Sequence, residues 1–319
     1  MANAYTDIAS GASLGTNLVK TAYDRLVEFN LRTQPFYRQI ADKRPAQQSM
    51  PGQTIVFNMY VDLAPAVTPL NEVVDPDTVA IPQTTQVSVT LQEYGNAALA
   101  TRKLRLFALS DVDPAIADIV TFNMLDSLDN VIRDVVRQGS QVIREVGGVM
   151  KPVGVASATN TVTATDVFQS RDVRAAVAKL RALGVMPQSG SDFVGYMHPD
   201  QSYDLRSQTS NAEWRPPAMY SDASRIWSGS VGQYEGVEWI ESPRVYRATD
   251  GASSAPVYRA LVFGKQALAE AVAQEPGVVF GPITDRLNRF RPIGWYGVLG
   301  WSIYRDQSIV RIETSTSLQ

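Results

Sequence analysis

The sequence predicts an α+β fold whose first half contains an extended two-stranded loop followed by a long helix. Gln53–Val61 and Thr84–Leu91 alternate apolar and polar residues and are rich in β-branched side chains, which is typical of strands. Four prolines separate these two segments: Pro65, Pro69, Pro76 and Pro82. Because so many prolines do not fit a compact turn, we expect the strands to lead out to a long loop and back.

The long helix is the second observation. Asp113 can cap a helix whose first turn contains Pro114, and Gly147 and Gly148 are typical of its end. One apolar stripe runs along the segment through Ile116, Val120, Met124, Leu128, Val131, Val135 and Val142. At 1.5 Å per residue the predicted helix is roughly 50 Å long.

A two-stranded ribbon is marginal in water unless it packs against another surface. We therefore expect neighbouring copies of the chain to cover most of its apolar side chains, which are Ile55, Phe57, Val87 and Val89. This expectation indicates a protein that functions in an assembly.

Further elements precede and follow this region. An amphipathic helix is expected at residues 17–31, behind an N-terminal tail. Helices are also predicted at Asp172–Leu183 and at Gln266–Gln274, and a short helix is expected to follow His198-Pro199-Asp200 and run to Ser207. The predicted strands are Asp192–Met197, Val237–Ile240, Tyr258–Phe263, Pro292–Tyr304 and Ser308–Glu313. This alternation predicts a compact mixed α/β domain followed by C-terminal strands.

Composition excludes several classes of function. The 319 residues include no cysteine and one histidine, which removes thiolate chemistry, the usual zinc ligand sets and most general-base schemes. A net charge of −3 argues against a protein that coats duplex DNA by bulk electrostatics. We expect no signal peptide, no membrane span, no metal and no cofactor.

The remaining candidates for chemistry have simpler explanations. His198 follows a predicted strand beside Asp200 and Ser202, where short polar residues are ordinary turn formers. Asp111, Asp113 and Asp118 are acids at a helix start, which the helix dipole favours. We therefore predict that the protein is not an enzyme.

Several motifs, taken in order, resemble a known family. They are Tyr23-Asp24-Arg25, Lys43-Arg44-Pro45, Gly52 to Ile55, Leu63 to Leu70, Gln92 to Gly95, Phe263 to Leu268 and Ser308 to Glu313. They are similar to motifs of the major capsid proteins of tailed bacteriophages with the Hong Kong 97 type of shell fold, in the branch of podovirus N-four. The sequence departs from that branch at Asn71-Glu72-Val73, where the family usually has an acidic residue followed by glycine.

The resemblance implies a shell subunit divided into five parts. These are an N-terminal arm (1–45), an extended β loop (46–100), a peripheral domain with the spine helix (101–150), an axial α/β domain (151–275) and C-terminal strands that return through the peripheral to the axial domain (276–319). It also implies hexamers and pentamers in an icosahedral head shell around double-stranded DNA, assembled in the host cytoplasm. Separate scaffold, portal and decoration proteins are implied partners.

Charge is distributed unevenly along the chain. There is no Lys or Arg from Pro45 to Thr101, whereas the loop carries Glu72, Asp75 and Asp77. We hypothesise that these acids meet arginines of a neighbouring subunit. Arg133, Arg137 and Arg144, which would share one face of the predicted helix, are the first candidates. Arg286, Arg289 and Arg291 are the second, since the resemblance implies that their turn approaches local three-fold contacts.

Alternatives remain at this point. The first arginine set could instead be a solvated helix face, or could contact phosphates of packaged DNA. The chain could also be an encapsulin-like nanocompartment shell protein, or an enzyme of unknown type.

Overall fold

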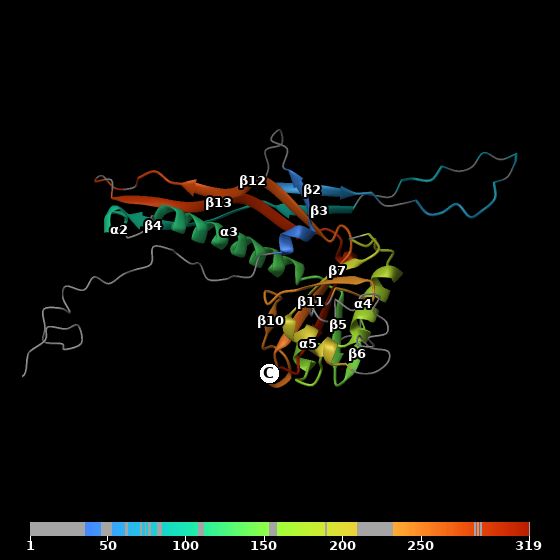
Figure 1. Cartoon of the computed structure of the whole chain (residues 1–319). Helices are drawn as coiled ribbons and strands as arrows, with labels where there is room; N and C mark the ends of the chain where they lie inside the picture. The colour runs from blue at the N-terminus through green and yellow to red at the C-terminus, as the bar shows by residue number, and fades with distance from the viewer. Residues whose placement is uncertain are drawn as a thin grey trace, which may run out of the picture.

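The computed structural model shows an elongated molecule with a long flat part and a compact part (Figure 1). The structure describes residues 36–45, 53–60, 63–70, 72–73, 75, 78–81, 85–107, 112–152, 158–188, 190–208, 232–283, 285, 287 and 289–318. The arm helix predicted at 17–31, Asp77 and Arg286 lie outside these residues.

A four-stranded sheet forms the long part, in the order β1-β12-β13-β4. The strands are β1 (Ala41–Pro45), β4 (Gln92–Thr101), β12 (Leu268–Phe280) and β13 (Phe290–Ile303). Helix α3 (Val112–Val136) lies along this sheet, and a short helix, α2 (Arg102–Phe107), precedes it (Figure 1). Val120, Leu128 and Ile132 of α3 share one buried cluster with Trp295 and Leu299 of β13. The apolar stripe of the helix is therefore covered by the sheet.

The predicted ribbon is present as β2 (Thr54–Met59) and β3 (Thr85–Thr90), an antiparallel pair with Thr54 opposite Thr90. The expectation that other subunits cover its apolar face is wrong at its base. Phe57 is 4% exposed and Val89 is fully buried within this one chain. Both pack against Ala269 and Ala271 of β12, whose small side chains let the ribbon approach closely. Beyond this base the loop projects from the molecule (Figure 1).

An eight-stranded sheet forms the compact part. Its order is β6-β5-β14-β11-β7-β9-β8, with β10 paired to β11. The strands are β5 (Val142–Val146), β6 (Val149–Lys151), β7 (Phe193–Met197), β8 (Gln233–Tyr234), β9 (Val237–Glu241), β10 (Arg247–Ala248), β11 (Val257–Phe263) and β14 (Ile309–Thr314). Helices α4 (Ser170–Ala182) and α5 (Pro199–Ser207) lie in the same part. Short 3-10 helices occur at Tyr37–Ile40 (η1), Thr159–Thr161 (η2), Ala252–Ser254 (η4) and Asp306–Ser308 (η5).

Helix α4 covers this sheet through its apolar face. Val173, Val177 and Leu180 share a buried cluster with Phe193 of β7 and Val262 of β11. The helix begins with a capping box, in which the Gln169 and Asp172 side chains accept from each other's backbone N–H groups. The predicted strands and helices of this region, from residue 172 to residue 263, are confirmed as elements.

The predicted long helix is wrong in its last ten residues. It ends at Val136, and residues 142–146 instead form β5, parallel to β14. Alternating burial of Ile143 and Glu145 follows the two-residue period of a strand. Gly147 and Gly148 both have positive φ values, and they turn the β5–β6 hairpin rather than ending a helix. At 1.5 Å per residue the 25-residue helix is roughly 37 Å long.

The helix predicted at Gln266–Gln274 is also wrong, because residues 268–274 belong to β12. Its alanines favour a helix by intrinsic propensity. They occur at alternating positions, however, and Ala269 and Ala271 form the surface beneath the ribbon while Leu268 faces the cluster around α3. Tertiary packing therefore overrides the local preference.

Candidate inter-subunit surfaces

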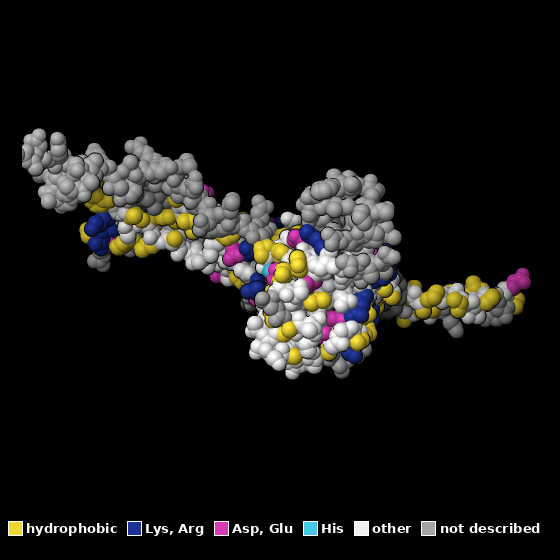
Figure 2. Space-filling model, turned by 60° about the horizontal axis from the view of Figure 1, so that its bottom comes forward, with side chains coloured by type: hydrophobic (Ala, Val, Ile, Leu, Met, Phe, Trp, Pro, Cys, Tyr) yellow, Lys and Arg dark blue, Asp and Glu magenta, His cyan; other side chains and the backbone are white. Residues whose placement is uncertain are grey.

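The projecting loop combines acids with exposed apolar side chains. Glu72 and Asp75 are both exposed. Among the apolar residues of the loop, Val67 is 85% exposed and Val73 is 91% exposed. Figure 2 shows acidic side chains at the end of the loop and hydrophobic ones along it. An apolar surface of this extent, presented on a projection, is typical of a protein–protein contact.

Arg133 and Arg137 contact their own chain. The Arg137 Nε atom lies 3.2 Å from Asp134 Oδ1, and its guanidinium lies 4.2 Å from the ring centroid of Tyr246. Arg133 is 3.7 Å from the same carboxylate and donates to the carbonyl oxygen of Arg244 at 3.5 Å. Both arginines thus help to attach the end of α3 to the segment that carries Tyr246.

Arg144 is not on the helix with Arg133 and Arg137, so the predicted common face of three arginines is wrong. It lies on β5, and its Nε atom is 2.6 Å from Glu313 Oε2 of β14. Arg311 and Arg259 also approach this fully buried carboxylate, at 2.9 and 3.5 Å. Burial is the main cause that lowers the pKa of Arg311, with the charges of Arg259 and Arg144 acting in the same direction.

This arginine–glutamate cluster was missed in the sequence because its members come from three strands. Only the pairing of β5 and β11 with β14 brings them together. Since Glu313 has no contact with water, removing it would leave three neighbouring guanidinium groups without their shared carboxylate. Arg144 therefore has a structural role within the subunit.

Arg289 and Arg291 lie at the opposite end of the molecule from the loop. The Arg289 Nε atom is 2.5 Å from Asp285, and its backbone oxygen accepts from Arg102 N at 2.8 Å, which places α2 beside the β12–β13 turn. Arg291 lies over the ring of Phe280 at 5.5 Å. Exposed cations and apolar side chains share this end, which we call the distal end: Arg102, Lys103, Leu106, Phe107, Leu287, Arg289 and Arg291.

Figure 2 shows dark blue and yellow side chains together at this end. Arg102 and Lys103 are exposed at this end, beside Arg289 and Arg291. The molecule therefore carries an acidic, apolar surface at one end and a basic, apolar surface at the other.

A buried polar junction connects the two parts of the molecule. The Asp129 carboxylate of α3 accepts from the backbone N–H groups of Phe36 and Tyr37, at 2.9 and 2.8 Å. Its other oxygen accepts from Arg244 Nε at 2.9 Å. Phe36 also packs edge-on against Tyr196 of β7, with 4.4 Å between ring centroids. Because these contacts span more than ninety residues of sequence, no local pattern could have predicted them.

His198 has a capping role. Its Nδ1 atom accepts from the backbone N–H of Asp200 at 3.2 Å, at the start of α5. Burial lowers the pKa of His198, which favours the neutral ring that this acceptor role requires. The Ser202 hydroxyl donates to the Pro199 carbonyl oxygen at 2.9 Å and so is not directed at the imidazole. The turn interpretation of this motif is confirmed.

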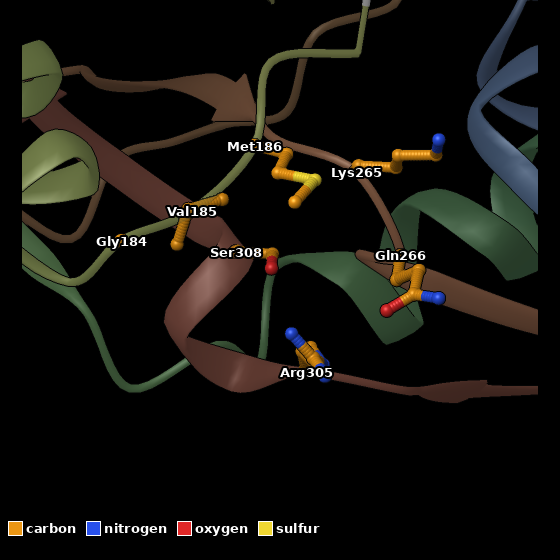
Figure 3. Close-up of a pocket in the computed structure, with 7 residues that line it drawn as sticks. All are labelled: Gly184, Val185, Met186, Lys265, Gln266, Arg305 and Ser308. Carbon is orange, nitrogen blue, oxygen red and sulfur yellow. The ribbon is translucent and has the colours of Figure 1, made fainter. Parts of the chain in front are cut away.

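A cavity of about 260 Å³ lies where the two sheets meet. Figure 3 shows its lining: Gly184, Val185, Met186, Lys265, Gln266, Arg305 and Ser308. These seven residues supply two cations and no carboxylate. Within the described part of the chain, no three metal-binding side chains gather at one point, and no helix is long and apolar enough to cross a membrane.

Comparison with known proteins gives the family. The family model described as phage capsid protein matches residues 10–317. No sequence among the curated proteins matches.

Solved structures show the same fold. The capsid of Ralstonia phage GP4 superimposes with a TM-score of 0.74 at 16% identity, covering 98% of this chain and 99% of that one. The cyanophage Pam1 capsid gives a TM-score of 0.72 at 19% identity, covering 96% and 99%. The acid-stable capsid of Helicobacter pylori bacteriophage KHP30 gives 0.70 at 12% identity, covering 99% of each chain. At such identities the likeness shows the fold alone.

The chain belongs to the phage capsid protein family, because the family model spans nearly its whole length. Family and fold together give it the role of a major capsid protein that forms the head shell of a phage.

Proposed function

We propose that the chain assembles with copies of itself as hexamers and pentamers into an icosahedral head shell that encloses double-stranded DNA. The observation that carries this proposal is the projecting loop. Its base is anchored on the sheet of its own subunit, whereas the described apolar residues along the rest of the loop, such as Val67 and Leu70, are exposed. A second copy is the partner that a closed shell supplies in a fixed position.

The contact that fits best joins the loop tip of one subunit to the distal end of another. Glu72 and Asp75 are exposed at the tip, with Asp77 adjacent in sequence. Arg133, Arg137 and Arg144 are partly buried against groups of their own chain, whereas Arg102, Lys103, Arg289 and Arg291 are exposed, so the distal end is the preferred partner. Such a head-to-tail contact uses two different surfaces, and repeating it generates rings or shells.

Three finer points belong to the same proposal. The division into arm, extended loop, peripheral domain, axial domain and C-terminal strands is supported by the two sheets, with β12 and β13 in one and β14 in the other. Membership of the branch that resembles podovirus N-four is supported by the ordered motifs. Scaffold, portal and decoration proteins, and assembly in the host cytoplasm, are expected from the family role.

Charge reversal tests the contact. We expect the triple variant Glu72→Lys, Asp75→Lys, Asp77→Lys to remain folded and to lose shell formation at low salt, because like charges then face each other at every interface. Adding Arg289→Glu and Arg291→Glu in the same chain should partly restore shells, whereas Arg133→Glu with Arg137→Glu should not. Electron microscopy of the purified proteins measures the outcome.

The wild-type particle tests the function itself. Shells built of hexamers and pentamers are expected, whereas small cages filled with an enzyme cargo would indicate a nanocompartment, and small discrete oligomers would contradict both. A triple lysine variant that forms normal shells at low salt would contradict the proposed contact only.

A further inference from the structure

Two buried acids face each other between α4 and β5. Glu145 of β5 and Asp172 of α4 are both fully buried. One oxygen of each has an ordinary partner. Glu145 Oε1 accepts from Arg171, and Asp172 Oδ2 accepts from the backbone N–H of Gln169 at 3.0 Å. Arg171 also donates to the carbonyl oxygen of Gly148 at 2.7 Å, which ties it to the β5–β6 turn.

The second oxygen of each acid has no donor. Glu145 Oε2 and Asp172 Oδ1 are buried, and neither atom has a hydrogen-bond donor. The two side chains lie within hydrogen-bonding reach. Two ionised carboxylates in contact would repel each other in a buried, dry environment. One shared proton replaces this repulsion with a strong hydrogen bond. Burial, followed by the charge of Glu145, raises the pKa of Asp172 to about 8.

Neighbouring charged groups do not neutralise the pair in place of this proton. Among the residues that the structure describes, Arg171 is the cation that pairs with it, so two ionised acids would leave an excess negative charge. On β14, Ile312 faces α4 and is uncharged, whereas Arg311 and Glu313 belong to the cluster on the other face of the sheet. On β6, Met150 lies opposite Glu145. Asp166, which accepts from the Gly148 N–H beside the β5–β6 turn, adds no positive charge.

We propose that Glu145 and Asp172 form a proton-operated latch that holds α4 against β5. With the proton present, one hydrogen bond joins the helix to the strand. Without it, two buried negative charges push the start of α4 away from the β5–β6 hairpin. The start of α4 depends on the position of Asp172, because Asp172 is both the latch acid and the residue whose side chain accepts from the Gln169 N–H in the capping box.

The sign of the pH dependence follows from linkage. A carboxyl group with a raised pKa in the folded state binds its proton more tightly than in the unfolded chain, where its pKa is about 3.9. The latch therefore contributes its full stability below about pH 4. That contribution is lost as the pH rises towards about 8.

Thermal unfolding of the full chain between pH 5 and pH 9 tests the latch. Glu145→Gln keeps the shape, and its amide donates to Asp172 without a titrating proton. We expect the wild-type Tm to fall across this range by ~5 °C or more relative to that of the variant. Glu235→Gln is the matched control, because Glu235 pairs with Arg174 of α4 at the surface, and its curve should follow the wild type.

Parallel wild-type and Glu145→Gln curves would overturn the proposal. Infrared spectroscopy of the wild type gives an independent readout should the variant fail to fold. The carbonyl-stretching band of a protonated carboxylic acid is expected at pH 7 and should disappear in alkali. Its absence at pH 7 would equally overturn the proposal. Hydrogen exchange should place the alkaline loosening at residues 142–151 and 170–182, and uniform loosening would contradict a local latch.

Discussion

The compact part and the long part of the molecule differ in how many large apolar side chains they leave exposed. Among the described residues, the large apolar side chains that are exposed lie mainly in the long part, its loop and its distal end. The compact part contributes Val149, Met186, Tyr203 and Leu318 to that group. Buried acids, by contrast, occur in both parts: Glu145, Asp172 and Glu313 in the compact part and Asp129 and Glu270 in the long part, each placed against a group of the same chain.

This difference indicates which part is complete by itself. The eight-stranded sheet with α4 and α5 covers its own core, as an independent domain does. The long sheet is covered by α3 on one face and by the ribbon base on part of the other, and its two ends present exposed apolar surface. We infer that the compact part is rigid before assembly, whereas the ends of the long part are completed by neighbours.

A substitution at the junction between the two parts should cause the largest loss of stability. Asp129→Ala would remove the acceptor for two buried N–H groups and leave Arg244 with Asp126 alone. Breaking such a buried pair costs about 3–5 kcal/mol, so we expect a correspondingly lower free energy of unfolding. Asp134→Ala, which removes a half-exposed acid of the same helix, should cost less than ~1 kcal/mol. Urea unfolding measures both, and equal effects would mean that the junction does not hold the parts together.

The second largest effect is expected from comparing substitutions at the base and at the tip of the loop, which should change the free energy of unfolding by different amounts. Phe57→Ala is expected to destabilise the isolated subunit by about 3 kcal/mol, because Phe57 packs in the core beside Tyr304. Val67→Ala at the exposed tip should change the free energy of unfolding by no more than ~0.5 kcal/mol. Thermal unfolding of unassembled protein compares the two. A tip substitution as costly as the base substitution would show that the subunit covers its own loop.

A substitution of Asp166 is expected to have a smaller effect on the free energy of unfolding, and this effect should depend on pH. Although burial opposes it, hydrogen bonds from Thr163 and from the Gly148 N–H lower the pKa of this carboxyl group. A lowered pKa gives stability above the unfolded value of about 3.9, and that stability is lost as the pH falls further. Asp166→Asn should therefore cost about 1–2 kcal/mol at pH 7 and progressively less in acid. Unfolding curves that stay separated by the same amount at pH 2 would contradict this assignment.

Local pattern was sufficient for about half of the described helices and strands. The ribbon strands, α4, β7, α5, β9, β11 and the two C-terminal strands follow from alternation, helical periodicity and turn residues near their predicted bounds. The acidic loop could also be read directly, because the charges of Glu72 and Asp75 and the lack of nearby cations are properties of composition. Ordered motifs gave the family, which the family model then confirmed.

Tertiary structure decided what depends on partners distant in sequence. Val142 continues the spacing of the helical stripe, yet pairing with Arg311 on β14 makes it the start of a strand. Ala269 and Ala271 favour a helix until the ribbon of Phe57 and Val89 packs on them. Arg144 resembled a surface cation because its partner, Glu313, is 169 residues away. In each case the local free-energy preference is a few tenths of a kcal/mol per residue, which burial and buried charge pairing exceed.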